Sequence, residues 1–384
     1  MKKLAIITTH PIQYQIPLFK KLQKRNIKTN VFFASKHGLG SVTKDHEFKI
    51  RLKWDLGKDM LKGYQSYFPK KQKFNINDFR LSFNNIEKKL SENKYDALLL
   101  LGWNNLHYLK AFWFANKYNI KIIIRVETNL KSKISFSKKI IKYFLLKYFF
   151  SKIDFFLSIG KLNKQFYIFH KVNKKKIFKA PYSVDNKFFI NKNKKSNFLK
   201  KINLNKKKII LFVGKFIPRK RPIDFIKLAK IFESENSLHF IMIGNGEMYN
   251  ECQNYLSNLN IKNLDIKGFV NQKELIDYYN ISELLIITSS YETWGLTINE
   301  AFNCGLPVIC TKECGASHDL IKNNFTGLTF NSGDIKELQK KVKFFLKNQK
   351  IKLRIKKNMK NIINKFSLDE TVNSIEKILN KISK

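Results

Sequence analysis

The chain has 384 residues, which is enough for one large domain or two domains of ordinary size. Hydrophobic residues make up 43% of it and aromatic residues 14%, so it can bury a sizeable core and is not intrinsically disordered. Lys and Arg number 74 against 29 Asp and Glu, a formal net charge of +45 that excludes an acidic scaffold and favours anionic partners.

The first half of the chain predicts alternating strands and helices. A helix is expected to begin at His10 and Pro11, because apolar residues such as Ile16 and Phe19 follow at helical spacing. Another helix is expected over residues 105–118. Continuous apolar runs, typical of strands buried on both faces of a parallel sheet, lie at 3–8, 29–34, 97–101, 121–126, 154–159 and 177–180.

The second half repeats the alternation after a linker. Residues 181–208 have the Asn- and Lys-rich composition of that linker. Strands are then predicted at 209–213, 238–243, 264–266, 284–288 and 307–311, and helices at 221–233, 246–259, 272–280, 296–304 and 334–348. The last predicted helix, 367–382, is amphipathic and has Ser367 as its candidate N-cap.

This alternation predicts the α/β class, with two Rossmann-like doubly wound domains that face a cleft. We expect one domain over residues 1–185 and a second over residues 186–365. The closing helix, within residues 366–384, is expected to cross back to the first domain.

Two explanations of the charge remain open. Only seven basic residues are Arg, and Lys, Asn, Ile and Phe share A/T-rich codons, so a biased genome could produce much of the excess. A protein that reads a nucleic-acid sequence generally uses more Arg, whose planar guanidinium pairs with guanine and phosphate. We therefore expect no specific nucleic-acid partner, and a membrane surface is the favoured anionic partner.

The N-terminal segment predicts no secretory signal peptide. Lys2 and Lys3 precede a short apolar stretch that His10 and Pro11 interrupt. No run of about 18 apolar residues occurs, so no helix is expected to span a bilayer. These features predict a cytoplasmic protein with free thiols, either in solution or at the inner face of the cytoplasmic membrane.

A metal site is not expected. Cys310, Cys314 and His318 are spaced by four residues, which could place three ligands on one helix face. Gly315 breaks that helix, and the segment follows a strand that begins at Pro307.

The motifs that predict chemistry follow strands of the second half. Gly214 allows the backbone to approach a ligand, and Lys215, Arg219 and Lys220 cluster behind it, a set that suits a diphosphate. An ordinary lysine-rich loop is the alternative. A second strand ends in the tight turn of residues 244–246, which lacks the third glycine of a dinucleotide fingerprint.

Residues 289–309 contain the most informative pattern. Gly295 and Leu296 open a helix after a parallel strand, and the free N–H groups of such a helix bind anions. Glu300 lies about 7 Å further along the axis, where its carboxylate can accept hydrogen bonds from a ribose diol. Glu292, on the other side of the anion site, could hold a sugar hydroxyl. The order of sugar, diphosphate and ribose is that of a nucleotide sugar.

Residues 209–330 resemble the donor domain of the large retaining glycosyltransferase family 4, which has the two-domain GT-B fold. The resemblance rests on the Glu-x7-Glu motif at Glu292 and Glu300, on the stretch AFNCGLPVI after it, and on the glycine and lysines of the basic loop. Weaker similarity covers the whole chain. Residues 180–185 resemble the interdomain hinge, 365–367 the start of the last helix, and 9–19 the opening of a bacterial branch.

The resemblance implies a role for each donor-side residue. Glu292 would contact the transferred sugar, while Lys215 and Lys220 would neutralise the diphosphate; these three form the expected catalytic set. The other expected donor-binding residues are Gly214, Arg219, Val270 near the nucleobase, the amides near Trp294, Gly295 and Leu296, and Glu300 at the ribose. Family members transfer with retention and generally need no metal, and the nucleotide sugar is a substrate, so no cofactor is implied.

The acceptor side departs from the family pattern. The first-domain loop lacks the glycine pair of many relatives and offers His10 and Gln13 instead, and Arg125 and Glu127 end a strand on the cleft side. We take these four as acceptor-side candidates for a glycan or lipid-linked acceptor in cell-surface polysaccharide synthesis. His10 could instead be a helix-entry residue, and Arg125 and Glu127 a simple ion pair.

Residues 133–150, KISFSKKIIKYFLLKYFF, mix lysines with strongly apolar positions. Such a segment cannot span a membrane, but it could lie on an anionic one. The alternative is a core-packing helix with a lysine-rich outer face. Two other functions also remain open for the chain as a whole: a GT-B nucleotide-sugar epimerase, and a non-catalytic basic adaptor for membrane or nucleic acid.

Overall fold

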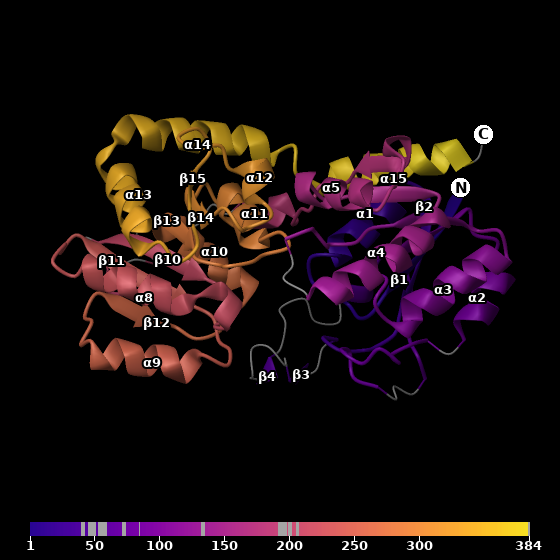
Figure 1. Ribbon diagram of the computed structural model, residues 1–384, viewed down its shortest axis with the longest axis horizontal. Coiled ribbons are helices and arrows are strands. Elements are labelled where there is room, and N and C mark those ends of the chain that lie inside the picture. The colour runs from indigo at the N-terminus through magenta and orange to yellow at the C-terminus, as the bar shows by residue number, and fades with distance from the viewer. Residues whose placement is uncertain are drawn as a thin grey trace. The chain divides into compact units, whose positions relative to one another are not determined.

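The computed structural model describes residues 1–39, 43–44, 51–52, 60–70, 74–83, 85–131, 135–190, 198, 202–204 and 207–382. The chain divides into two compact units (Figure 1). Unit 1 comprises Met1–Thr43, Leu56–Tyr182 and Ser367–Lys384, and unit 2 comprises Lys44–Asp55 and Ser183–Phe366. The boundaries that we expected, after residue 185 and before residue 366, lie close to the ends of these units.

Unit 1 contains a seven-stranded parallel sheet in the order β5-β2-β1-β6-β7-β8-β9. All six strands expected here are present, and β5 is an additional one. Their bounds are β1 Lys2–Thr8, β2 Ile27–Phe33, β5 Gln65–Tyr67, β6 Ala97–Leu100, β7 Lys121–Ile124, β8 Phe155–Ser158 and β9 Ile177–Lys179. Alternate residues of β1 enter two separate cores, one on each face of the sheet, which explains why these strands are apolar throughout.

The helices of unit 1 within the described residues are α1 Ile16–Lys24, α2 Ile86–Glu92, α3 Leu106–Lys117, α4 Phe136–Ser151, α5 Lys161–Phe169 and α15 Leu368–Ile382. The expected helix start at His10 and Pro11 was wrong. The helix begins at Ile16 and has Pro17 in its first turn, where the missing proline N–H costs no hydrogen bond. A short pair, β3 Thr43–Lys44 and β4 Arg51–Leu52, forms its own sheet.

The last helix, α15, belongs to unit 1 as expected. It packs against α1, and Lys21 of α1 forms a 2.5 Å ion pair with Asp369. The hydroxyl of Ser367 accepts a 3.5 Å hydrogen bond from the backbone N–H of Glu370, which confirms the expected cap.

Unit 2 contains a six-stranded parallel sheet in the order β12-β11-β10-β13-β14-β15. The five expected strands are present, and β15 is an additional one. Their bounds are β10 Lys208–Val213, β11 Leu238–Ile243, β12 Leu264–Ile266, β13 Ser282–Ile287, β14 Val308–Thr311 and β15 Leu328–Phe330. The chain leaves β10 toward one edge of the sheet and returns at β13 toward the other, so the topological switch point lies between these strands.

The helices of unit 2 are α6 Asn186–Phe189, α8 Pro222–Ile231, α9 Tyr249–Asn258, α10 Gln272–Ile281, α11 Leu296–Asn303, α12 Ser317–Leu320, α13 Ile335–Lys347 and α14 Gln349–Ile363. We did not expect α14 or the short helices α6 and α12. Helix α6 occupies part of the expected linker. Much of that linker, at 191–197, 199–201 and 205–206, lies outside the described residues. Among the described residues, no helix combines the length and the apolar character that crossing a membrane requires.

Candidate functional site

A pocket of about 270 Å³ opens in unit 2 at the switch point of the sheet. Its walls come from the ends of β10 and β11, the segment before α10, and the first turns of α10 and α11. The lining residues are Val213, Gly214, Lys215, Arg219, Lys220, Ile243, Gly244, Phe269, Val270, Gln272, Leu275, Thr297 and Glu300.

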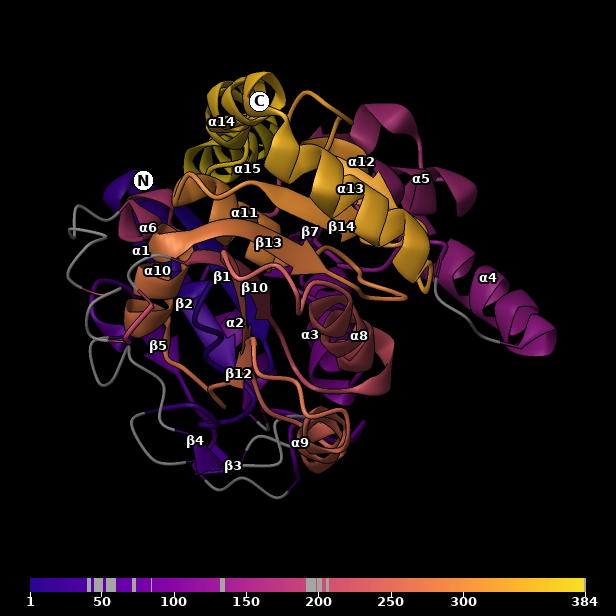
Figure 2. The ribbon, with the colours of Figure 1, turned by 90° about the vertical axis from the view of Figure 1, so that its left-hand side faces the viewer.

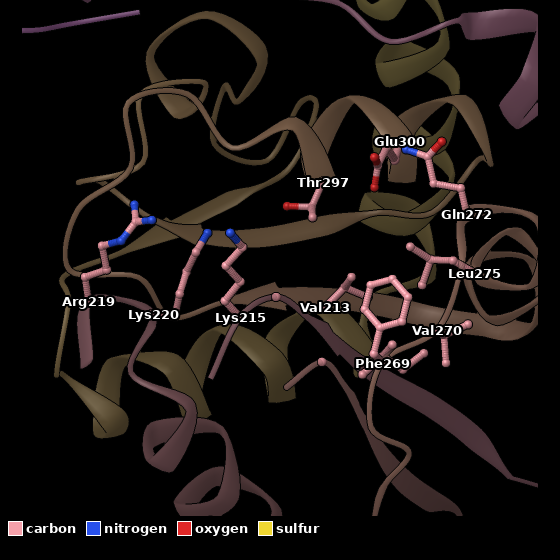
Figure 3. Close-up of a pocket in the computed structure, with 13 residues that line it drawn as sticks. Val213, Lys215, Arg219, Lys220, Phe269, Val270, Gln272, Leu275, Thr297 and Glu300 are labelled. Carbon is pink, nitrogen blue, oxygen red and sulfur yellow. The ribbon is translucent and has the colours of Figure 1, made fainter. Parts of the chain in front are cut away.

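The pocket has a cationic end and an apolar end (Figure 3). Lys215, Lys220 and Arg219 lie at one end, and Phe269 and Val270 at the other, among the labelled side chains. The hydroxyl of Thr297 lies between the two ends, and Glu300 and Gln272 lie above the apolar one (Figure 3). Such a pocket can accept a molecule with a polyanion at one end and a flat apolar group at the other.

Backbone contacts fix the basic loop to the end of β13. The hydroxyl of Thr288 donates to the carbonyls of Lys220 and Arg221 at 2.7 and 3.0 Å. The backbone N–H of Ser290 donates to the carbonyl of Arg219 at 2.8 Å. The backbone of the loop is therefore anchored to the end of β13 independently of its side chains.

The structure joins two residues to which we gave separate roles. Lys220 Nζ pairs with Glu292 Oε1, and only 17% and 9% of these side chains are exposed. Ser289 donates a further hydrogen bond of 3.1 Å to the same oxygen. Glu292 is not among the lining residues, so in this structure it contacts the pocket through Lys220.

Glu300 is buried in the wall of the pocket. It is 8% exposed, and the hydroxyl of Tyr279, from α10, donates to its carboxylate at 2.7 Å. Burial raises the pKa of Glu300 to about 7, and the hydrogen bond from Tyr279 opposes that rise. Our sequence analysis missed Tyr279, because its position at the end of an amphipathic helix gives no signal that distinguishes it from a core residue.

The start of α11 contributes less to the pocket than expected. Thr297 and Glu300 line it, whereas Trp294, Gly295 and Leu296 do not. The Trp294 side chain is buried, and its indole N–H donates to Asn299 at 2.8 Å. Trp294 therefore has a packing role at the start of α11.

Close backbone packing explains the turn of residues 244–246. Gly244 has φ +151°, and a Cβ there would lie 1.8 Å from the carbonyl oxygen of Gly214. A Cβ at Gly246 would lie 2.5 Å from the carbonyl oxygen of Phe216. These glycines let the turn after β11 lie against the basic loop, where only glycine fits.

Replacing Gly244 by Ala should therefore lower the free energy of unfolding by about 3 kcal/mol and weaken ligand binding at the pocket. Gly305→Ala is the matched control, because Gly305 also has a positive φ, +74°, but no atom of a non-neighbouring described residue lies within 4 Å of its Cβ position. The free energy of unfolding of that variant should fall by only about 1 kcal/mol. Urea denaturation measures both, and equal losses would show that the close approach at Gly244 is unimportant.

The acceptor-side candidates belong to unit 1, at the ends of β1 and β7. The hydroxyl of Tyr182 donates to Glu127, and the guanidinium of Arg125 lies 5.0 Å from the centre of the Tyr182 ring. Tyr14 contacts the same ring edge-on, with 5.5 Å between centroids. Tyr182 thus contacts both Arg125 and Glu127, which we expected to form an ion pair. Burial raises the pKa of the Glu127 carboxyl above its ordinary value.

The loop after β1 holds the other two candidates. Thr9 Oγ1 and His10 Nδ1 lie 2.9 Å apart, and the His10 ring contacts that of His37. Both polar atoms of the Gln13 side chain are buried without a hydrogen-bond partner among the described residues. Since such an amide is costly to leave unpaired, Gln13 marks a place where a ligand hydroxyl would be favoured. Tyr14 and Tyr182 were missed because aromatic residues are abundant throughout the sequence.

Residues 194–362 match the family of glycosyl transferases group 1. Unit 2 is therefore similar to a group 1 glycosyl transferase domain over most of its length. Its pocket is formed by the segments in which the sequence resemblance was found, and this supports the coarser expectation of a GT-B glycosyltransferase.

Curated relatives of this transferase domain match over parts of their length. A 2-deoxystreptamine N-acetyl-D-glucosaminyltransferase of Niallia circulans is 28% identical over 137 residues, 35% of each chain. A poly(ribitol-phosphate) alpha-N-acetylglucosaminyltransferase of Staphylococcus aureus is 28% identical over 208 residues, 52% of this chain and 40% of the relative. An uncharacterized glycosyltransferase of Methanocaldococcus jannaschii is 24% identical over 173 residues, 45% of this chain. The matches span about a third to a half of these relatives.

Solved structures match the whole chain. Anabaena HepE, in complex with UDP and glucose, has a TM-score of 0.76 at 13% identity and covers 99% of this chain and 100% of its own. A glycosyltransferase of Rickettsia africae has a TM-score of 0.77 at 16% identity, with 100% of this chain and 99% of its own covered. The fold is therefore GT-B, with two Rossmann-like units, as the sequence predicted.

Proposed function

We propose that the protein is a retaining glycosyltransferase that moves a sugar from a nucleoside-diphosphate sugar to a glycan or lipid-linked acceptor in cell-surface polysaccharide synthesis. The observation that carries this proposal is the two-ended pocket inside a group 1 glycosyl transferase domain. The cations suit the diphosphate, Glu300 the ribose diol, and Phe269 and Val270 the nucleobase. The side chains of Phe269 and Val270 are apolar, which suits recognition of a base by stacking and shape.

The chemistry follows from the charge at the cationic end. As the bond between the sugar and the diphosphate breaks, negative charge develops on the leaving oxygen. Lys215, Arg219 and Lys220 provide fixed positive charge there, so we propose transfer without a metal ion. The acceptor oxygen forms the new bond to the sugar carbon, and its proton goes to the departing diphosphate. Glu292 holds Lys220 in place and contacts the transferred sugar.

The relatives support the choice of partners. The HepE structures contain UDP, glucose or UDP-glucose, which favours a nucleotide sugar as donor. A Campylobacter jejuni relative, 22% identical over 170 residues, is named for an acceptor on diphospho-undecaprenol. On unit 1, the polar groups of Gln13, Arg125 and Glu127 suit the hydroxyls of such an acceptor. We propose that the protein does this work in the cytoplasm, at the inner face of the membrane.

UDP or GDP should raise the melting temperature of the protein, because a ligand that binds only the folded state stabilises it by mass action. A thermal-shift screen over nucleoside diphosphates and their sugars measures this. Release of an epimerised free sugar and a nucleoside diphosphate, with water consumed and no acceptor present, would indicate an epimerase. A melting temperature that no nucleoside diphosphate changes would contradict the proposal and favour a non-catalytic adaptor.

A further inference from the structure

Helix α4 of unit 1, whose ribbon is labelled in Figure 2, has a stripe of exposed apolar side chains. Five large side chains of the helix form the stripe, and their exposed fractions are Ile140 44%, Ile141 61%, Phe144 62%, Leu145 63% and Tyr148 69%. At about 100° per residue they occupy one continuous face of the helix. The opposite face carries Leu146 and Phe150, which are 1% and 2% exposed and pack into the core of unit 1.

The alternative that we gave for residues 133–150, a core-packing helix with a lysine-rich outer face, agrees with the structure only in part. Leu146 and Phe150 do pack into the core, but the outer face carries five large apolar side chains as well as lysines. Of the expected segment, residues 133–134 lie outside the described residues. The apolar surface continues onto α5, where Phe169 is 51% exposed and contacts Tyr143 with ring centroids 5.3 Å apart.

Charge distinguishes between the possible occupants of this surface. Lys138 and Lys147 project at the two edges of the stripe by helical geometry, both are exposed, and α4 contains no Asp or Glu. Their long stems can reach out from an apolar face to phosphate groups. A second copy of the chain would bring the same lysines and a net charge of +45, so self-association is disfavoured.

We propose that α4 lies in the interface of an anionic membrane, with the stripe among the acyl chains and the flanking lysines at the lipid phosphates. A stripe of large aromatic and aliphatic residues edged by lysines has the chemistry of an interfacial helix. The anchor needs no change in the fold, since the stripe already faces solvent. Unit 1 also holds the acceptor-side candidates, so the same unit would meet the membrane and a lipid-linked acceptor.

Co-sedimentation with vesicles tests the anchor. The protein should bind vesicles of phosphatidylcholine mixed with phosphatidylglycerol at least tenfold more tightly than vesicles of phosphatidylcholine alone. Phe144→Ser/Leu145→Ser should reduce that binding about tenfold or more. Lys138→Gln/Lys147→Gln should reduce it roughly tenfold and weaken its dependence on salt. Leu353→Ser is the matched control, because Leu353 is 59% exposed on α14 of unit 2, and it should bind as the wild type does.

Three outcomes would overturn the anchor. The first is an absence of binding, or equal binding to both kinds of vesicle. The second is unchanged binding by the serine variant, with its melting temperature and nucleotide binding intact. The third is a concentration-dependent dimer, seen by sedimentation, that the serine variant abolishes, which would assign the stripe to contact between copies.

Discussion

The Lys220→Met variant should lose about 10²- to 10³-fold in kcat/KM and about 3 kcal/mol in the free energy of unfolding. The first loss is expected because Lys220 would neutralise charge on the leaving diphosphate. The loss of stability is expected because the carboxylate of Glu292, whose side chain is 9% exposed, would remain buried without the lysine that neutralises it. Steady-state kinetics and urea denaturation measure the two losses separately.

A double variant separates catalysis from stability. Lys220→Met/Glu292→Gln removes both charges, so it should recover most of the lost stability but none of the activity. Lys215→Met is the matched control, because Lys215 lines the same pocket while Lys220 is the partner of Glu292. It should lower kcat/KM with a smaller loss of stability. A Lys220→Met enzyme within about twofold of wild-type kcat/KM would show that the cationic end does not hold the reacting phosphate.

Nucleotide affinity should fall as the pH drops below about 7, roughly tenfold per pH unit, because in our proposal the ribose diol would donate to the ionised carboxylate of Glu300. Glu300→Gln should bind nucleotide more weakly and with no such dependence. Tyr279→Phe removes a hydrogen bond that favours the carboxylate, so it should move the midpoint of the titration to higher pH. Isothermal titration calorimetry over this pH range measures all three proteins.

The free energy of unfolding gives an independent measure of the protonation of Glu300. The pKa of Glu300 rises from 4.5 in the unfolded chain to about 7 in the fold, so the folded state holds a proton that the unfolded state releases. The stabilisation present at low pH is therefore lost as the pH rises through this window. Above pH ~7, the free energy of unfolding of Glu300→Gln should exceed that of the wild type by about 3 kcal/mol. Equal stability of the two proteins at every pH would contradict the burial of an ionisable carboxylate.

Local pattern predicted the strands better than the helix starts. Strands such as 238–243 and 264–266 match the structure because burial on both faces leaves a continuous apolar run. The start of α1 was misplaced because two prolines, Pro11 and Pro17, could each occupy a first turn. Only the packing of the helix on the sheet selects the second of them.

Long-range partners were beyond prediction. Lys220 and Glu292 are 72 positions apart, and each was recognised, but nothing in the sequence indicates that they form a pair. Tyr279, 21 positions before Glu300, was not recognised at all. Pairing of this kind depends on which strand ends become neighbours in the sheet, and that order is a property of the whole fold.

The sequence by itself determined the α/β class, the two Rossmann-like units and the residues of the basic loop. It could do so because the periodicity of apolar residues, the positions of glycines and the charges are all visible within short stretches of sequence. The tertiary structure decided how buried each of those residues is. It placed Glu300 where desolvation raises its pKa, and it turned the apolar stripe of α4 toward solvent. The physical reason is that burial and electrostatic environment are set by residues distant in sequence, which a linear pattern does not encode.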